Sequence, residues 1–170
     1  MANPLVVLLM GSDSDLPTVK EACLVLQSFG VPFEAHVLSA HRTPDDLVAY
    51  VRKAEQSGVR VFIAAAGGAA HLAGVVAAHT SRPVIGIPIQ TSSLGGLDSL
   101  LSTVQMPGGV PVATMAIGTP GARNAGLFAV QILALADSTL ATKLQDYRNQ
   151  QVEAVRQKDK KIQTELGLSH

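Results

Sequence analysis

Short apolar runs alternate with segments of helical periodicity five times along this 170-residue chain. Most of the runs are apolar throughout, which is typical of strands buried on both faces of a parallel sheet. No hairpin signal joins consecutive runs, so the pattern predicts five βα units. We therefore expect an α/β fold with three αβα layers, an open parallel sheet between helices. The predicted strands are Leu5–Met10, Phe33–Leu38, Val61–Ala65, Val84–Ile87 and Val112–Ile117.

Two of the predicted helices have clear end signals. The first helix ends at Gly30, because glycine readily adopts the left-handed conformation of a C-cap. The second begins after Thr43, a natural N-cap, and closes at Gly58. Two later segments, Ala69–His79 and Ala125–Ala136, are apolar all round, which is typical of helices pressed between a sheet and a neighbour.

The charges exclude some classes of function and indicate assembly. Thirteen basic and thirteen acidic residues give no net charge, so the basic surface that nucleic-acid binding requires is absent. Between Gln56 and Ala136 the chain carries only four charged residues, Arg60, Arg82, Asp98 and Arg123. A surface that poor in charge is typical of subunit contacts, so we expect a homo-oligomer.

Residues 1–136 are predicted to form one α/β core, followed by a C-terminal helical arm over 137–170. The arm places apolar side chains at helical spacing on a charged helix, and it is expected to lie on the core or on another subunit. No apolar run reaches the roughly 18 residues of a membrane span, and the start lacks the features of a signal peptide. These features predict a cytoplasmic protein without membrane contact.

Polar side chains gather in the loops that follow the predicted strands, where open parallel sheets bind ligands. We expect the site there. The five loops are Gly11–Asp15, Ser39–Pro44, Ala66–His71, Gln90–Ser93 and Gly118–Gly121.

The first three loops carry groups suited to a sugar phosphate. Hydroxyls such as Ser12 and backbone N–H groups at a helix start suit a phosphate, whereas a carboxylate such as Asp15 suits sugar hydroxyls. Arg42 can bond two phosphate oxygens, and His41 can move protons near neutral pH. The pair Gly67–Gly68 lets the backbone approach a ligand closely.

Each of these signals also has an ordinary structural interpretation. Ser12 and Asp15 are equally compatible with plain helix caps, and a lone loop histidine such as His41 is more often structural than catalytic. A Gly-Gly pair is usually only a turn. Their shared position at consecutive strand ends is what favours a site.

Together the loops resemble a known family. The sequence reads Gly-Ser-x-Ser-Asp from Gly11, Ser-Ala-His-Arg-Thr-Pro from Ser39 and Ala-Gly-Gly-Ala-Ala-His-Leu-x-Gly from Ala66, with Gln-Met-Pro from Gln105. This order is similar to that of the N5-carboxyaminoimidazole ribonucleotide mutases, the PurE family of purine biosynthesis, from about Val6 through Tyr147. The departures are small: Asp13 stands at a variable position, Leu16 replaces a common aromatic residue and Ala73 replaces a frequent proline.

The resemblance implies a flavodoxin-like fold, a homo-octamer, and a reaction without metal or organic cofactor. It assigns His41 as the general acid/base and Ser12, Asp15 and Arg42 to the ribonucleotide. It places Gly67, Gly68 and His71 around the migrating carboxylate. The predicted substrate-binding set is completed by motif neighbours Ser14, Ser39 and Leu72.

The implied reaction moves a carboxylate from nitrogen to C4 of aminoimidazole ribonucleotide, through loss and recapture of CO2. An aminoimidazole ribonucleotide carboxylase of the same fold, which uses free CO2, would carry out a related reaction. The sequence His-Leu-x-Gly at His71–Gly74 argues against that branch. A flavin carrier would also fit the fold, although the chain has no Trp and only two Tyr to stack on the ring. If His41 were inert, the chain would be a non-catalytic nucleotide-binding module.

Overall fold

The computed structural model describes residues 3–168 and divides the chain into two compact units, Met1–Ile132 and Leu133–His170. The first unit is built on a five-stranded parallel sheet in the order β2-β1-β3-β4-β5. This order confirms the predicted open parallel sheet and is that of flavodoxin-like folds. The chain leaves β1 for one edge and returns past it to β3, so the topological switch point lies between β1 and β3. The strands are β1 (Val6–Met10), β2 (Phe33–Val37), β3 (Val61–Ala66), β4 (Val84–Pro88) and β5 (Ala113–Thr114).

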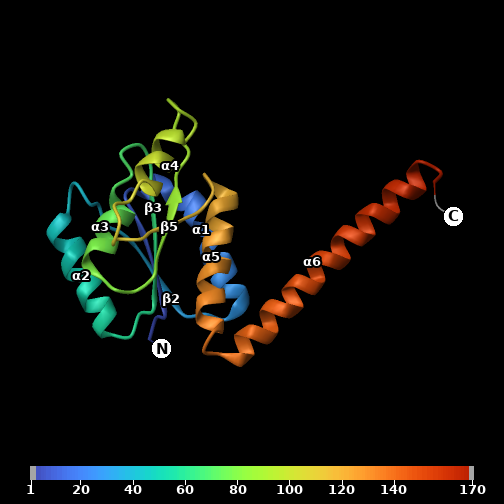
Figure 1. Cartoon of the computed structure of the whole chain (residues 1–170), viewed down its shortest axis with the longest axis horizontal. Helices are drawn as coiled ribbons and strands as arrows, with labels where there is room; N and C mark the ends of the chain where they lie inside the picture. The colour runs from blue at the N-terminus through green and yellow to red at the C-terminus, as the bar shows by residue number, and fades with distance from the viewer. Residues whose placement is uncertain (1–2, 169–170) are drawn as a thin grey trace. The chain divides into compact units, whose positions relative to one another are not determined.

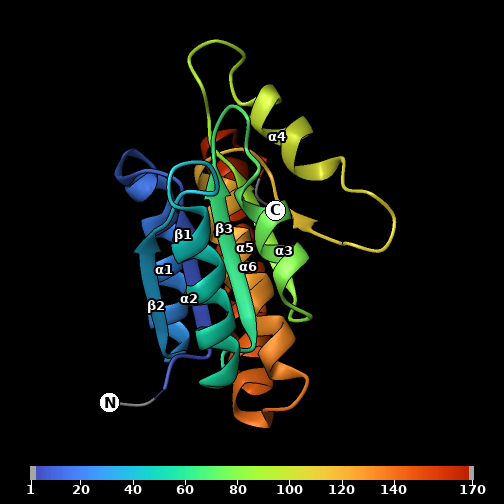
Figure 2. The same ribbon diagram turned by 90° about the vertical axis from the view of Figure 1, so that its left-hand side faces the viewer.

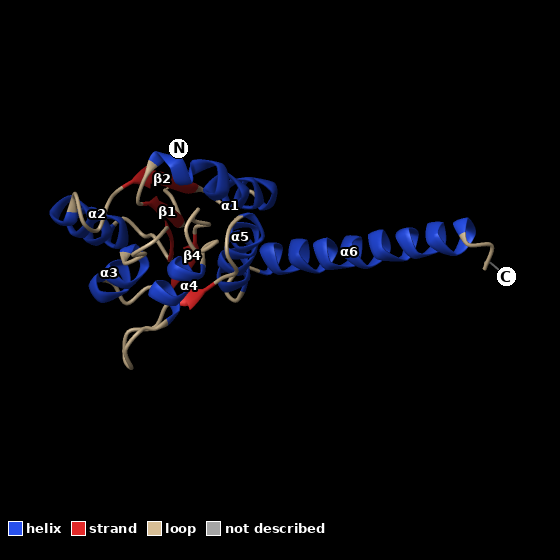
Figure 3. Cartoon of the chain, turned by 90° about the horizontal axis from the view of Figure 1, so that it is seen from above, coloured by secondary structure: helices blue, strands red, loops and turns tan. Residues whose placement is uncertain are grey.

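Helices cover both faces of this sheet, which gives the three predicted layers (Figures 1 and 3). Helices α2 and α3 lie on one face, and α1 and α5 lie on the other. Helix α4 packs beside β4 and β5, towards the carboxyl ends of the strands (Figure 2). Their bounds are η1 (Asp13–Asp15), α1 (Leu16–Phe29), α2 (Pro44–Gln56), α3 (Leu72–His79), α4 (Leu97–Val104) and α5 (Thr119–Ala134).

The core lies between the sheet and its helices. Side chains of β1 and β3 are fully buried, as their uninterrupted apolar sequences predict. On one face, Phe62 of β3 packs in a cluster with Leu47 and Val51 of α2 and with Val76 of α3. On the other face, α1 and α5 approach so closely that a Cβ at Gly126 would lie 2.9 Å from the Ala22 carbonyl oxygen. Only glycine allows that approach without displacing a helix.

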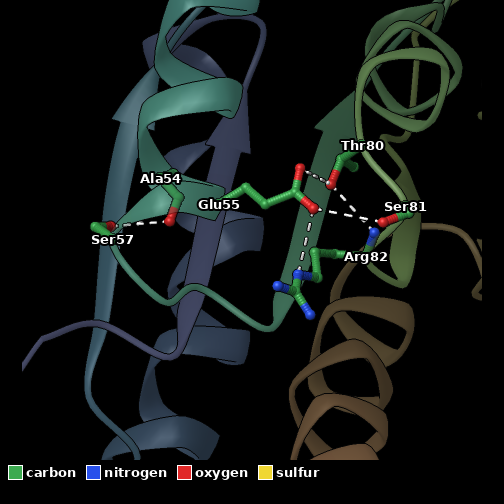
Figure 4. Close-up of polar contacts among 6 residues, drawn as sticks. All are labelled: Ala54, Glu55, Ser57, Thr80, Ser81 and Arg82. Carbon is green, nitrogen blue, oxygen red and sulfur yellow. Dashed lines mark hydrogen bonds and ion pairs between the residues drawn. The ribbon is translucent and has the colours of Figure 1, made fainter.

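A polar cluster joins the end of α2 to the loop between α3 and β4 (Figure 4). The Glu55 carboxylate accepts hydrogen bonds from the hydroxyls of Thr80, at 2.9 Å, and Ser81, at 3.4 Å. It also pairs with Arg82, with 3.4 Å between Nε and Oε1. The cluster joins the end of α2 to the end of α3, at the edge of the sheet away from the carboxyl ends of the strands.

The helix ends confirm some sequence predictions and correct others. Gly30 adopts the left-handed conformation at the end of α1, as expected. Thr43 does precede α2, but its side chain makes no cap; its hydroxyl bonds with Ser39 instead. The segment expected to be helical from Ala69 becomes α3 only at Leu72, because tight turns with hydrogen bonds from Ala70 to Gly68 and from His71 to Ala69 precede it.

Two further expectations are corrected. The fifth strand, expected over Val112–Ile117, pairs with β4 only at Ala113 and Thr114, since the chain turns away at the edge of the sheet. The helix expected at Ala125–Ala136 is longer at its start, and α5 begins at Thr119.

The charge-poor stretch, residues 56–136, exposes its apolar side chains elsewhere than on the all-apolar helix predicted at Ala69–His79. In α3, Val76 is fully buried against the chain's own sheet. The exposed apolar side chains of this stretch instead include four on or just before α4: Leu94, Leu97, Leu101 and Val104, each about half exposed. We call these four residues the α4 apolar face.

The second unit is dominated by one long helix, α6 (Ser138–Glu165). Asp137 caps it, because its carboxylate accepts hydrogen bonds from the backbone N–H groups of Thr139 and Leu140 at 2.9 and 3.1 Å. Within residues 3–168, no helix is long and apolar enough to cross a membrane.

Candidate active site

A cavity of about 560 Å³ opens at the carboxyl ends of the strands, at the topological switch point. Four of the five loops singled out from the sequence contribute to it; the fifth, at Gly118–Gly121, does not. The volume suits a small organic ligand. The cavity is lined by Gly11, Ser12, Ser14, Asp15, Ser39, Ala40, His41, Arg42, Ala66, Gly67, Ala69, His71, Leu72, Ile89, Gln90 and Thr91.

The loop after β1 presents two hydroxyls and one carboxylate to the cavity. Ser12 caps the short helix η1, where its Oγ accepts a hydrogen bond from the Ser14 N–H at 3.3 Å. The Ser14 hydroxyl donates to the same oxygen at 2.9 Å. Ser12 is therefore a cap that also lines the cavity, and its contact with a phosphate stays a prediction.

Asp15 is a buried carboxyl that lines the cavity and is only 7% exposed. It stands at the N-cap position of α1 but its side chain caps nothing there. Burial raises the pKa of the Asp15 carboxyl, although hydrogen bonds from Ser12 and Ser14 and the charge of Arg42 act in the opposite direction. A buried carboxylate without a cap function is suited to accept hydrogen bonds from ligand hydroxyls.

The loop after β2 is held by hydrogen bonds centred on Ser39. Its Oγ accepts hydrogen bonds from the backbone N–H groups of His41 and Arg42, at 3.3 and 3.2 Å. The Arg42 guanidinium crosses to the loop after β1 and donates to the Gly11 carbonyl at 2.6 Å, while its Nε lies 3.4 Å from Ser39 Oγ. These bonds involve two of its five N–H groups and fix the plane in which the others can meet an anion.

Two histidines from different loops meet in the cavity. His41 Nε2 lies 2.8 Å from His71 Nδ1, and their rings stand nearly perpendicular, at 88°. His71 occupies the N-cap position of α3, but its side chain bonds to His41 instead of capping the helix. Because a nitrogen–nitrogen hydrogen bond needs one donor and one acceptor, this pair holds one proton between its rings. Such a pair can accept or deliver a proton.

Gly67 and Gly68 play different parts in the loop after β3. Gly67 lines the cavity, and a Cβ there would make only ordinary contacts, the nearest at 3.4 Å from Ile89, so packing alone does not require glycine at this position. Gly68, expected among the substrate-binding residues, is absent from the cavity lining. Its positive φ of 65° turns the peptide towards α4, where its N–H donates to Ser99 Oγ at 2.9 Å.

The fourth loop supplies lining residues that were not predicted as site residues. The stretch from Gln90 is one of the predicted strand-end loops, but no role was predicted for Gln90, Thr91 or the preceding Ile89. The side-chain amide of Gln90 and the hydroxyl of Thr91, just after a predicted strand, were the sequence signals that could have identified this part of the site. The other unselected lining residues, Gly11, Ala40, Ala66 and Ala69, contribute backbone and small side chains, for which a sequence gives no chemical signal.

Among the described residues, the side chains that line the cavity form neither a metal-binding cluster nor an aromatic platform. Within the described residues, no group of three His, Cys, Asp or Glu side chains could hold a metal ion. The lining also includes no Phe or Tyr ring that could stack on a flavin. Hydroxyls, one carboxylate, one guanidinium and two imidazoles thus surround the space, an arrangement suited to binding a sugar phosphate beside a proton-transfer pair.

Comparison with known proteins gives the family. The family described as AIR carboxylase, for aminoimidazole ribonucleotide, matches residues 5–154. The chain belongs to the AIR carboxylase family. In Synechocystis sp., a family member named N5-carboxyaminoimidazole ribonucleotide mutase is 59% identical over 146 residues, covering 86% of this chain and 82% of that protein.

Two further relatives extend the comparison. A Saccharomyces cerevisiae protein named phosphoribosylaminoimidazole carboxylase is 52% identical over 164 residues, which cover 96% of this chain but 28% of that protein. A crystal structure of Treponema denticola PurE superimposes with a TM-score of 0.85 at 28% identity, covering 93% of this chain and 98% of that one. The flavodoxin-like fold of this family member is thus confirmed.

Proposed function

We propose that this chain is an isomerase of purine biosynthesis. It converts N5-carboxyaminoimidazole ribonucleotide into 4-carboxy-5-aminoimidazole ribonucleotide. The single observation that carries the proposal is the contact between His41 and His71 in the cavity that also contains Arg42 and Asp15. The Synechocystis relative, at 59% identity, is named for this reaction.

The substrate divides naturally between the two sides of the cavity. Arg42 and the hydroxyls of Ser12 and Ser14 bind the phosphate, and Asp15 accepts hydrogen bonds from the ribose. Ser39 positions the loop that carries Arg42 and His41. Gly67, His71 and Leu72 surround the carboxylate and the imidazole ring, and Gly68 acts through the loop rather than by contact.

His41 carries the proton that the reaction requires. When the N–CO2 bond breaks, its electron pair stays on nitrogen, and the imidazolium of His41 protonates that nitrogen. C4 of aminoimidazole ribonucleotide then attacks the released CO2. The neutral His41 finally removes the proton from C4, which restores the aromatic ring and returns His41 to its starting state. No metal or organic cofactor takes part in these steps.

We also propose that the enzyme is a cytoplasmic homo-octamer. The α4 apolar face supports assembly, because three exposed Leu side chains and one Val, gathered on and just before a charge-poor helix, are typical of a subunit contact. His41 and His71 are exposed, whereas trapped CO2 must be kept from bulk water. Closure of the cavity by another copy of the chain would meet that need. In this proposal residues 1–136 form the catalytic core and 137–170 an arm for assembly.

The main competing function is carboxylation of aminoimidazole ribonucleotide by free CO2, and the name of the Saccharomyces relative favours it. Both reactions pass through the same C4 attack, so the same residues would serve either. What separates them is the substrate accepted.

Two assays without ATP, biotin or added metal distinguish the reactions. In the first, the purified enzyme receives N5-carboxyaminoimidazole ribonucleotide, and absorbance reports the C4-carboxylated product. In the second, it receives aminoimidazole ribonucleotide and bicarbonate at physiological concentration. We expect rapid product formation in the first assay and little above background in the second. The reverse result would establish the carboxylase, and product in neither would contradict both proposals.

A further inference from the structure

Helix α4 presents a row of polar groups to the loops that form one wall of the cavity. Ser99 is fully buried, although its side chain is polar, and it lies 31 residues from Gly68 in sequence. Its Oγ accepts the Gly68 N–H at 2.9 Å, and its O–H donates to the Ile89 carbonyl at 2.7 Å. One hydroxyl therefore connects the loop after β3 to the loop after β4.

Neighbouring groups of α4 reinforce this connection. The Ser102 hydroxyl donates to the Asp98 carbonyl at 2.8 Å and lies 3.2 Å from the Gly68 carbonyl oxygen, so both polar groups of that glycine face α4. Thr91, which lines the cavity, donates its hydroxyl to the Asp98 carboxylate at 2.8 Å. The polar side of α4 thus holds both loops.

The two loops have little freedom where Ser99 holds them. Gly68 adopts a positive φ and is followed by tight turns that lead to His71. The Ile89 N–H also donates to the Ala66 carbonyl at 2.9 Å, next to the Ser99 bonds. Loss of the Ser99 hydroxyl would remove the hydrogen-bond partner of the half-buried Ile89 carbonyl and of the half-buried Gly68 N–H, three residues before His71.

From these contacts we propose that Ser99 is a positioning residue, which fixes the loop Gly67–His71 so that His71 meets His41. Ser99 does not line the cavity. It acts only through the peptide of Gly68 and the carbonyl of Ile89. The proposal rests on the proposed function for its kinetic consequence, but its structural consequence can be measured independently.

The test compares Ser99→Ala with a matched control, Thr103→Val. Thr103 lies one turn later on α4, is 3% exposed, and donates its hydroxyl to the Ser99 carbonyl within the helix. Both substitutions delete one buried hydroxyl from α4. Only Ser99→Ala removes a bond to the cavity loops.

Kinetics should separate the two variants. The phosphate and ribose groups at Ser12, Asp15 and Arg42 remain in place in Ser99→Ala, so KM should stay within about threefold while kcat falls about tenfold or more. Thr103→Val should keep kcat within about twofold of the parent, even if its melting temperature falls as far as that of Ser99→Ala. Equal kcat losses in the two variants, or an unchanged kcat in Ser99→Ala, would show that Ser99 is only structural.

Hydrogen exchange tests the same claim without substrate. In Ser99→Ala, peptides spanning residues 66–72 should exchange about fivefold faster, since the Gly68 N–H loses its acceptor. In Thr103→Val those peptides should exchange as in the parent. Unchanged exchange in Ser99→Ala would overturn the proposal. If the parent lacked mutase activity but the exchange differed as expected, the proposed function would fail and the loop connection would stand.

Discussion

His41 Nε2 and His71 Nδ1 lie 2.8 Å apart, although the two residues are separated by thirty positions in sequence. The contact joins the loop after β2 to the loop after β3 across the carboxyl end of β1. The contact orients the His41 ring, and in the proposed mechanism it makes His71 part of the proton-transfer site.

Replacement of His41 by Asn should remove the proton carrier and keep the loop. We expect kcat to fall by about 10² to 10⁴, the usual contribution of one general acid/base, while nucleotide binding changes by a small factor. Steady-state kinetics and calorimetric titration with product measure the two effects. Near-normal turnover would contradict the role of His41.

Replacement of His71 should act through the orientation of His41. His71→Ala should lower kcat by about tenfold to a hundredfold. His71→Gln retains a hydrogen-bonding group towards His41, so it should recover part of that loss. The comparison is one of kcat at saturating substrate. If Ala and Gln behaved alike and both kept parental kcat, the histidine contact would have no catalytic role.

Arg42 should contribute mainly to binding. Arg42→Ala removes a charge-assisted hydrogen bond to phosphate, worth roughly 1.5 to 3 kcal/mol, so Kd should rise by about tenfold to a hundredfold. Arg42→Lys should not restore affinity fully, since lysine cannot bond two oxygens and the Gly11 carbonyl in one plane. Parental affinity in both variants would place the phosphate elsewhere.

The ionised Asp15 carboxylate should lower the free energy of unfolding at neutral pH, because burial raises the pKa of this group from its usual 3.8. Between pH 3.8, the ordinary pKa that the unfolded chain has, and the higher pKa of the folded state, the folded state binds more protons than the unfolded state. Stability from this group is therefore greatest below pH 3.8 and falls as pH rises through that window. Asp15→Asn should melt at a higher temperature than the parent at pH 7, and the difference should shrink towards pH 4.

The same Asp15→Asn variant should bind the nucleotide about tenfold more weakly, since an amide accepts hydrogen bonds from ribose less strongly than a carboxylate. Melting curves across pH and titration with product measure the two effects. Asp13→Asn, at the exposed neighbouring carboxyl, serves as the control. A variant that was less stable at pH 7 and bound normally would contradict both statements.

Assembly should depend on the α4 apolar face. Leu101→Asp should reduce the mass measured by light scattering and reduce activity with it. Leu24→Asp on α1 is the matched control, because Leu24 and Leu101 are both 47% exposed. A parent that was an active monomer of 17.7 kDa would contradict the proposed octamer.

The sequence predicted the sheet well because β1, β3 and β4 are apolar on both faces, as strands buried between two layers of helices require. It also identified the first three loops of the cavity by their polar residues. It predicted too long a strand at Val112–Ile117, since an edge strand with few pairing partners has no sequence mark for where it ends.

The remaining differences concern contacts between segments far apart in sequence. Nothing local indicates that Gly68 turns towards Ser99 and away from the cavity, or that Thr43 bonds to Ser39 rather than capping its helix. The contact between His41 and His71 likewise depends on how two loops meet. Such pairings are decided by tertiary packing, which local propensity does not encode.

The central claim is that the carboxylate moves within one bound substrate, and an isotope experiment tests it most directly. The enzyme receives substrate with a ¹³C-labelled N-carboxylate in excess unlabelled bicarbonate, and mass spectrometry measures the label in the C4-carboxylated product. The proposed mechanism predicts that nearly all product molecules retain ¹³C at early times. Product carrying the unlabelled carbon of the bicarbonate pool would contradict it.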